Sequence, residues 1–192
     1  MENVEAQVRL QPYLQPGEAI LWTGGPDPRR LLSTKDIFLI PFSLLWGGFG
    51  IFWEASVLSF GRGPTQPPIF FVLWGIPFVV VGQYFIWGRF LVKRRERRRT
   101  IYAVTNQRLL VLRGRTLQSI FLSQLPPIIQ SSHADGSGSL EFGNTGGWYG
   151  YGAWANTGMD FFSMGRMPLA FYDIPNVTEV YSLISRARKQ PE

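Results

Sequence analysis

Two long apolar stretches dominate this sequence and constrain what the chain can fold into. Residues 37–60 and 69–88 carry a single charged side chain between them, Glu54. About 20 predominantly apolar residues suffice to cross a bilayer as a helix, and in lipid only a helix satisfies its own backbone within one segment. The stretches therefore predict a transmembrane helical hairpin over residues 36–92, with spans at about 37–60 and 69–90. The alternative is a buried hairpin in a soluble protein, but a chain of 192 residues offers a small core for two such helices.

A cluster of basic side chains directly after the second stretch predicts the orientation. The turn between the stretches carries only Arg62. Because Lys and Arg near short spans stay in the cytoplasm, both termini should be cytoplasmic. We call the following residues the juxtamembrane basic cluster: Lys93, Arg94, Arg95, Arg97, Arg98 and Arg99.

The juxtamembrane basic cluster has two compatible interpretations. As a topology signal and solvated linker it needs no ligand. Basic residues beside a span also attract anionic lipid headgroups, at about 1 kcal/mol per residue. The net charge of +6 comes largely from this cluster. Nucleic acid is not an expected partner, because the charge is tethered at the membrane and lacks interleaved aromatic side chains.

The second half of the chain has the pattern of short antiparallel strands followed by one helix. Alternating or β-rich segments and turn residues predict strands at 101–105, 109–112, 116–122, 128–131, 139–142 and 169–172. After Asn176 the apolar residues Val177, Val180, Tyr181 and Ile184 recur at helical spacing. The expected fold class is an α+β membrane protein: a two-helix transmembrane hairpin, then a small β-barrel or two-sheet domain capped by a C-terminal α-helix.

Four short segments resemble the bacterial pleckstrin-homology-like (PH-like) membrane proteins, a family of unknown function. They are YAVTNQRLL at 102–110, LQPGEAILW at 14–22, SGSLEF at 137–142 and IPNV at 174–177. The resemblance implies a seven-stranded, two-sheet domain, no known enzymatic activity, and a multi-pass protein of the bacterial inner membrane. The expected division is a cytoplasmic N-terminal segment (1–35), the hairpin (36–92) and a cytoplasmic PH-like domain (93–192).

Residues 143–167, here called the aromatic segment, form an insertion that the resemblance does not cover. It is too long for an ordinary hairpin loop, and such loops tend to be functional or disordered. One interpretation is an irregular loop that folds over the sheets. The other is a docking surface, because large aromatic side chains are enriched in interface cores. The candidate partner-binding residues here are Trp148, Tyr149, Tyr151, Trp154, Phe161 and Phe162.

Further candidate partner-binding residues lie in the first apolar stretch. Glu54 is either an interfacial carboxylate or a polar contact with a partner helix, since charges within a membrane usually have a partner. Gly47 and Gly50 would let another helix approach closely, whether the second span or a foreign one.

Catalysis and cofactors are not expected. The chain has one histidine, His133, and no cysteine, so a zinc or haem site built by this chain alone is improbable. The expected function is that of a non-catalytic accessory or assembly subunit bound to a larger inner-membrane protein complex. The alternative is an anionic-lipid-binding or self-assembling membrane scaffold. The expected partners are membrane lipids and an integral membrane complex or further copies of the chain.

Overall fold

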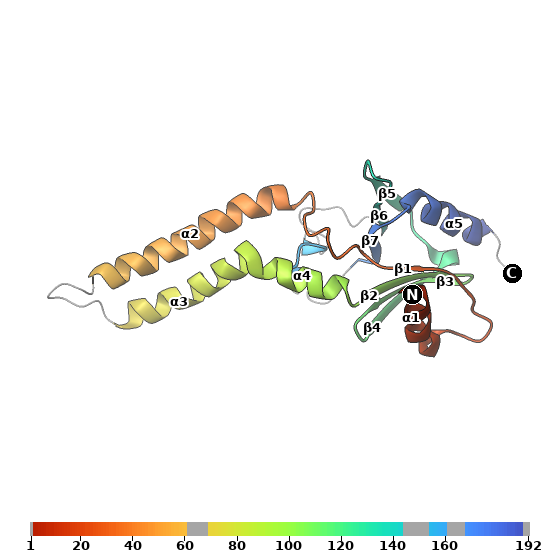
Figure 1. The fold of residues 1–192 in the computed structure, drawn as a ribbon, viewed down its shortest axis with the longest axis horizontal. Coiled ribbons are helices and arrows are strands. Elements are labelled where there is room, and N and C mark those ends of the chain that lie inside the picture. The colour runs from red at the N-terminus through yellow and green to blue at the C-terminus, as the bar shows by residue number, and fades with distance from the viewer. Residues whose placement is uncertain (1, 61–68, 144–153, 161–167, 190–192) are drawn as a thin grey trace. The chain divides into compact units, whose positions relative to one another are not determined.

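The computed structural model describes residues 2–60, 69–143, 154–160 and 168–189 as an α+β protein. Two compact units divide the chain (Figure 1). One comprises residues 32–93 and is helical; we call it the hairpin unit. The other, the sheet unit, joins residues 1–31 to residues 94–192. The sheet unit is therefore discontinuous in sequence, and the hairpin unit is inserted into it.

The hairpin unit contains two antiparallel helices. The first, α2, spans Asp36–Phe60. The second begins as α3 (Ile69–Gln83), passes through a π-helical turn, η2 (Tyr84–Gly88), and continues as α4 (Arg89–Arg97), whose residues from Arg94 onward belong to the sheet unit. Both helices are long and apolar enough to cross a membrane. Their outer surfaces expose large apolar side chains, among them Phe38, Leu45, Phe52, Ile69, Phe70 and Val80.

Seven strands in the described residues form the two antiparallel sheets of the sheet unit. The first sheet has the order β1-β2-β3-β4 and the second the order β5-β6-β7. Their bounds are β1 Ile20–Gly24, β2 Thr100–Thr105, β3 Arg108–Arg113, β4 Thr116–Phe121, β5 Ile128–Ser132, β6 Gly138–Phe142 and β7 Ala170–Ile174. A 3-10 turn, η3 (Leu122–Gln124), links the sheets, and the helix α5 (Val177–Lys189) follows β7.

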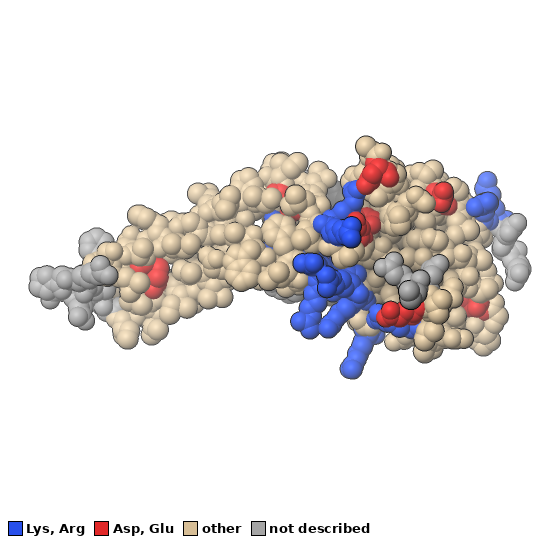
Figure 2. Space-filling model, in the orientation of Figure 1, with Lys and Arg blue, Asp and Glu red and all other residues tan. Residues whose placement is uncertain are grey.

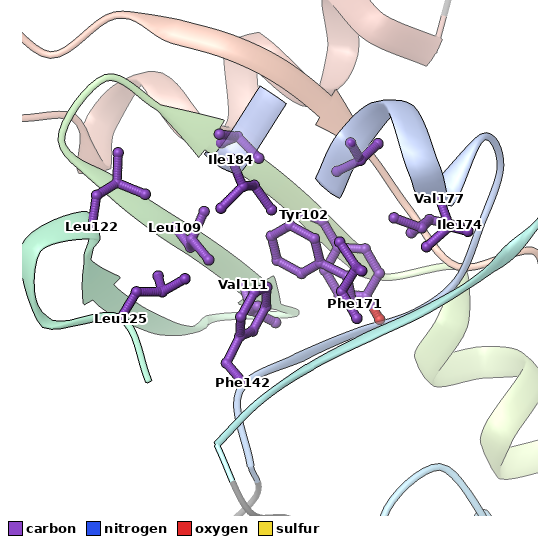
Figure 3. Packing of buried hydrophobic residues seen from close by; sticks show 13 residues of the cluster. Tyr102, Leu109, Val111, Leu122, Leu125, Phe142, Phe171, Ile174, Val177 and Ile184 are labelled. Carbon is purple, nitrogen blue, oxygen red and sulfur yellow. The ribbon is translucent and has the colours of Figure 1, made fainter. Parts of the chain in front are cut away.

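The main core lies between the sheets and α5. The Tyr102 ring of β2 stacks on the Phe171 ring of β7 with centroids 4.7 Å apart, and Figure 3 shows both rings at the centre of the cluster. From α5, Val177, Val180 and Ile184 are buried against the same cluster. Their spacing of three and four residues is the apolar face that predicts this helix, and it closes the core.

A helix at the N-terminus covers the other face of the first sheet. This helix, α1 (Glu2–Leu10), is followed by a 3-10 turn, η1 (Gln11–Tyr13). Ala6 and Leu10 of α1 join a second apolar cluster with Ile101 and Leu110. All six residues of β2 are buried because both faces of the sheet are covered.

The six predicted strands and the final helix all have counterparts in the structure. The N-terminal region differs from the expected division. Residues 1–35 are predicted as a segment of their own, whereas β1 pairs with β2, with Trp22 opposite Val104. Without β1, the edge of β2 that faces away from β3 would leave a row of backbone groups without partners, and β1 satisfies them.

Candidate functional site

Four glycines of the hairpin unit lie where α2 and α3 contact each other: Gly47, Gly50, Gly75 and Gly82. A Cβ added at Gly82 of α3 would lie 2.7 Å from the Cα of Gly47 on α2. A Cβ added at Gly50 would lie 3.4 Å from the backbone of Phe78. In the structure the close approach predicted for Gly47 and Gly50 is thus made with α3, the second apolar helix of the same chain.

Glu54 also points toward α3. Its Oε2 is buried against Gly75, and a Cβ added at Gly75 would clash with it. Within the described part of the chain, Oε2 has no hydrogen-bond partner. Glu54 is predicted as an interfacial carboxylate or as a polar contact with a partner helix; in the structure its carboxylate packs on α3 of the same hairpin.

A buried ion pair that the sequence did not reveal joins the two helices at their other end. Arg89 Nη1 donates to Asp36 Oδ1, and both side chains are almost fully buried. Asp36 Oδ2 accepts from the backbone N–H of Ser33 at 2.5 Å, a capping bond at the start of α2, and from the Ser33 hydroxyl at 2.9 Å. Arg89 Nε donates to the carbonyl oxygen of Phe85 in η2 at 2.9 Å. A π-helical turn frees such a carbonyl from the helix ladder, which explains why η2 directly precedes Arg89.

The juxtamembrane basic cluster separates into two groups. Lys93 and Arg97 are 2% and 5% exposed, and their spacing of four residues places them on one face of α4. Arg94, Arg95, Arg98 and Arg99 are exposed. Figure 2 shows basic side chains gathered in the region of α4, with acidic side chains among them. Lys93 and Arg97 are both buried, so the lipid contacts predicted for the cluster are left to the exposed arginines.

Arg97 ties three separate segments of the sheet unit together. Its guanidinium pairs with Asp173 of β7, donates to the carbonyl oxygen of Asp27 at 2.7 Å, and donates to Asn156 Oδ1 at 2.7 Å. Asp173 has a φ of 48°, which is unusual for a residue other than glycine. Two hydrogen bonds help to hold Asp173 in this conformation: its carboxylate accepts from Arg97 Nη2, and its N–H donates to Ser139 Oγ at 3.0 Å.

Two of the four segments that carry the family resemblance, 14–22 and 102–110, meet in a second polar cluster, which we call the Glu18–Arg108 clasp. Arg108 Nε and Nη2 donate to the two Glu18 oxygens at 2.9 and 2.8 Å. The Thr105 hydroxyl donates to Oε1 and the Gln15 N–H donates to Oε2, each at 2.8 Å. Burial alone would raise the pKa of Glu18, but these hydrogen bonds and the Arg108 charge outweigh it and lower the pKa. The clasp is fully satisfied, which is typical of a structural rather than a reactive cluster.

Most of the aromatic segment lies outside the described residues, including Trp148, Tyr149, Tyr151, Phe161 and Phe162. Trp154 is described, and its side chain is 38% exposed. The turn after it is fixed: Ala155 packs with Ala170 and Tyr172 of β7, and Asp160 accepts a hydrogen bond from the Asn156 N–H at 2.8 Å. The described residues 154–160 of the segment thus pack on the second sheet, and the Trp154 side chain is partly exposed.

His133 lies in the turn between β5 and β6, and its side chain is about half exposed. Its Nε2 is 3.7 Å from Asp173 Oδ1, the carboxylate that Arg97 already neutralises. Among the described side chains, no group of three or more His, Cys, Asp or Glu is placed to hold a metal ion.

A groove of about 1240 Å³ runs through the sheet unit between α1, the segment after β1, the end of α4 and the turn before β6. Five arginines line it: Arg9, Arg29, Arg30, Arg97 and Arg98. Sequence reasoning missed this groove because its walls come from segments separated by the whole hairpin unit.

A search of family models, curated proteins and solved structures found no match to this chain, so its resemblance to the bacterial PH-like family remains a prediction.

Proposed function

We propose that this chain is a non-catalytic, membrane-anchored accessory subunit of a larger protein complex in the bacterial inner membrane. In this proposal the hairpin unit crosses the membrane twice, both termini are cytoplasmic, and the sheet unit is a PH-like domain. The aromatic segment docks on a partner protein. Each part of the proposal has its own support.

The observation that carries the proposal is the apolar surface of the hairpin unit. Large side chains such as Leu45 and Ile69 are each 75% exposed, although they are among the most hydrophobic residues. A monomer in water rarely exposes contiguous apolar patches larger than a few hundred Å². Lipid would cover this surface. Gly47 and Gly82 let α2 and α3 pack closely against each other, as small residues do between membrane helices.

The PH-like assignment is supported by the order of elements. Four strands, then three strands, then one helix whose apolar face closes the core follow the arrangement that the resemblance implies. The Glu18–Arg108 clasp adds support, because it joins two of the resembling segments, 14–22 and 102–110, through a buried ion pair.

Docking through the aromatic segment is supported by Trp154. Its ring is partly exposed on a turn that is fixed against β7, so little conformational entropy would be lost on binding. Burying an aromatic ring is worth a few kcal/mol, and Trp is the residue most enriched in binding hot spots. This part of the proposal predicts that loss of the ring releases a partner.

The test is co-purification of the full-length chain from membranes in mild detergent. Trp148→Ala together with Trp154→Ala should release an associated membrane protein complex, with at least a tenfold loss of recovered partner. Tyr181→Ala is the matched control, because Tyr181 on α5 is 37% exposed and lies far along the chain. Equal recovery from both variants would contradict docking through the aromatic segment.

A second candidate function is a membrane scaffold that holds the sheet unit on anionic lipid. The exposed arginines Arg94, Arg95, Arg98 and Arg99 support it. Changing these four to Glu should abolish the salt-sensitive attraction of the full-length protein to anionic vesicles. Under the accessory-subunit function the same change would leave partner recovery intact, so the two candidates are separable.

A further inference from the structure

The groove in the sheet unit has the size of a ligand site. Its volume of about 1240 Å³ slightly exceeds the 300–1,000 Å³, roughly, of common small-molecule pockets. Its wall includes backbone that comes unusually close: a Cβ at Gly25 would lie 3.0 Å from the carbonyl oxygen of Thr100. Trp22, Ala6 and Ile101 add apolar surface to the lining.

The acidic side chains of the groove are largely engaged. Asp173 pairs with Arg97, and Asp135 pairs with Arg30 at the rim. Asp27 Oδ1 accepts the Arg29 N–H at 2.9 Å. Glu5 on α1 is the remaining acid of the lining.

Three lining arginines, in contrast, have no acidic partner within the described residues: Arg9, Arg29 and Arg98. They come from α1, from the segment after β1 and from the end of α4. Arginines from separate segments that line one groove are suited to an anion with several oxygens, because each guanidinium presents a planar fork of donors.

Arg97 supplies the most specific sign of a binding site. It is 5% exposed and lines the groove, and its Nε–H has no hydrogen-bond partner among the described residues. Its Nη1 and Nη2 are already bonded to Asp27, Asn156 and Asp173. Buried N–H groups are almost always paired, so an acceptor oxygen from a ligand would complete this guanidinium.

We propose that this groove binds a phosphate-bearing ligand, with Arg9 and Arg98 on the phosphoryl oxygens and Arg97 Nε–H as a buried donor. The phosphate belongs either to a lipid headgroup or to a soluble phosphate ester. The site is independent of docking through the aromatic segment. It extends the scaffold candidate from diffuse attraction by exposed arginines to a defined pocket, and the experiment below separates these two.

The experiment uses the full-length protein in a neutral detergent and follows the ligand by phosphorus NMR. One arm titrates glycerol 3-phosphate in solution; the other titrates phosphatidylglycerol in the micelles, with phosphatidylcholine as the reference lipid. Arg9→Gln with Arg98→Gln removes two groove charges. Arg95→Gln with Arg99→Gln is the matched control, since it removes two exposed charges from the same region that do not line the groove.

We expect the groove pair to weaken binding about tenfold or more and the control pair to weaken it by about twofold at most. Binding in both arms identifies a phosphate ester, and binding of phosphatidylglycerol alone identifies a headgroup; either supports the site if it depends on the groove pair. Equal weakening by both pairs would show that diffuse charge is responsible and would overturn the proposal. Absence of binding by the unmodified protein in both arms would overturn it as well.

Discussion

Glu18→Gln tests the idea that the Glu18–Arg108 clasp holds the N-terminal segment on the first sheet. The carboxylate accepts four hydrogen bonds, two of them from Arg108. An amide keeps the shape but turns one acceptor into a donor, so two donors lose their partner and Arg108 loses its counter-charge. Breaking a buried pair in this way costs about 3–5 kcal/mol. The side chains of Glu18 and Arg108 are 0% and 8% exposed, so little solvent is available to compensate.

Hydrogen exchange of the full-length protein in mild detergent, read at peptides that cover β2 and β3, measures this loss. A change of about 3 kcal/mol corresponds to roughly hundredfold faster exchange. Glu5→Gln, an exposed change on α1, is the control and should stay within about 0.5 kcal/mol. Exchange accelerated less than threefold by Glu18→Gln, or equally by both variants, would refute the clasp as a stabilising element.

The same pair of proteins predicts a pH dependence. Because the folded state lowers the pKa of Glu18 below its usual 4.5, the clasp contributes fully above that value. As the pH falls below 4.5 the unfolded chain takes up the proton first, and the contribution is lost as the pH passes the folded pKa. Glutamine does not titrate, so the difference between Glu18→Gln and the unmodified protein should shrink toward acid. A difference that is constant from neutral pH to well below 4.5 would contradict the assignment.

Three further changes test the other parts of the structure. Gly82→Ala should destabilise the helix pair by about 1–3 kcal/mol and lower its thermal aggregation midpoint in detergent, because the new methyl group meets the backbone at Gly47; Gly48→Ala, with open space around it, should not. Reporter fusions at Thr65 and at the C-terminus should report opposite sides of the membrane, and a shared side would end the transmembrane hairpin proposal. Truncation before Asn176 removes three buried residues of the core cluster and should cause aggregation; a soluble, folded product would show that α5 is dispensable.

The sequence predicted those elements whose apolar pattern fits either a strand or a helix, but not both. The β-rich runs around Tyr102 and Leu110 and the helical spacing from Val177 to Ile184 each identify an element directly. The same pattern fails for α1. Its apolar residues Val4, Ala6, Val8 and Leu10 alternate as in a strand, yet the segment is a helix, and of these four residues only Ala6 and Leu10 are buried. No local signal distinguishes these cases, because the decision comes from the sheet on which α1 packs.

The polar contacts were the hardest part to predict. Asp36 and Arg89 pair across 53 residues, and nothing in their local sequence connects them. Within the juxtamembrane basic cluster, one run of similar residues supplies both a buried tie, Arg97, and exposed charges such as Arg98. Only the direction in which α4 presents each side chain separates these roles. For the same reason the groove and its arginines could not be found from spacing alone.

The discontinuous sheet unit has a consequence for how the protein is made. The ribosome synthesises β1 roughly 80 residues before its partner β2, and at about 5–20 residues per second this takes about 4–16 s. During that time the backbone donors and acceptors of β1 lack their partner strand. Because α2 packs antiparallel on α3, the chain leaves the hairpin at the end where it entered, so formation of the hairpin would shorten the loop that β1 and β2 must close. A fragment that starts at β2 lacks both β1 and α1; its unpaired edge and uncovered sheet face would make it prone to aggregate.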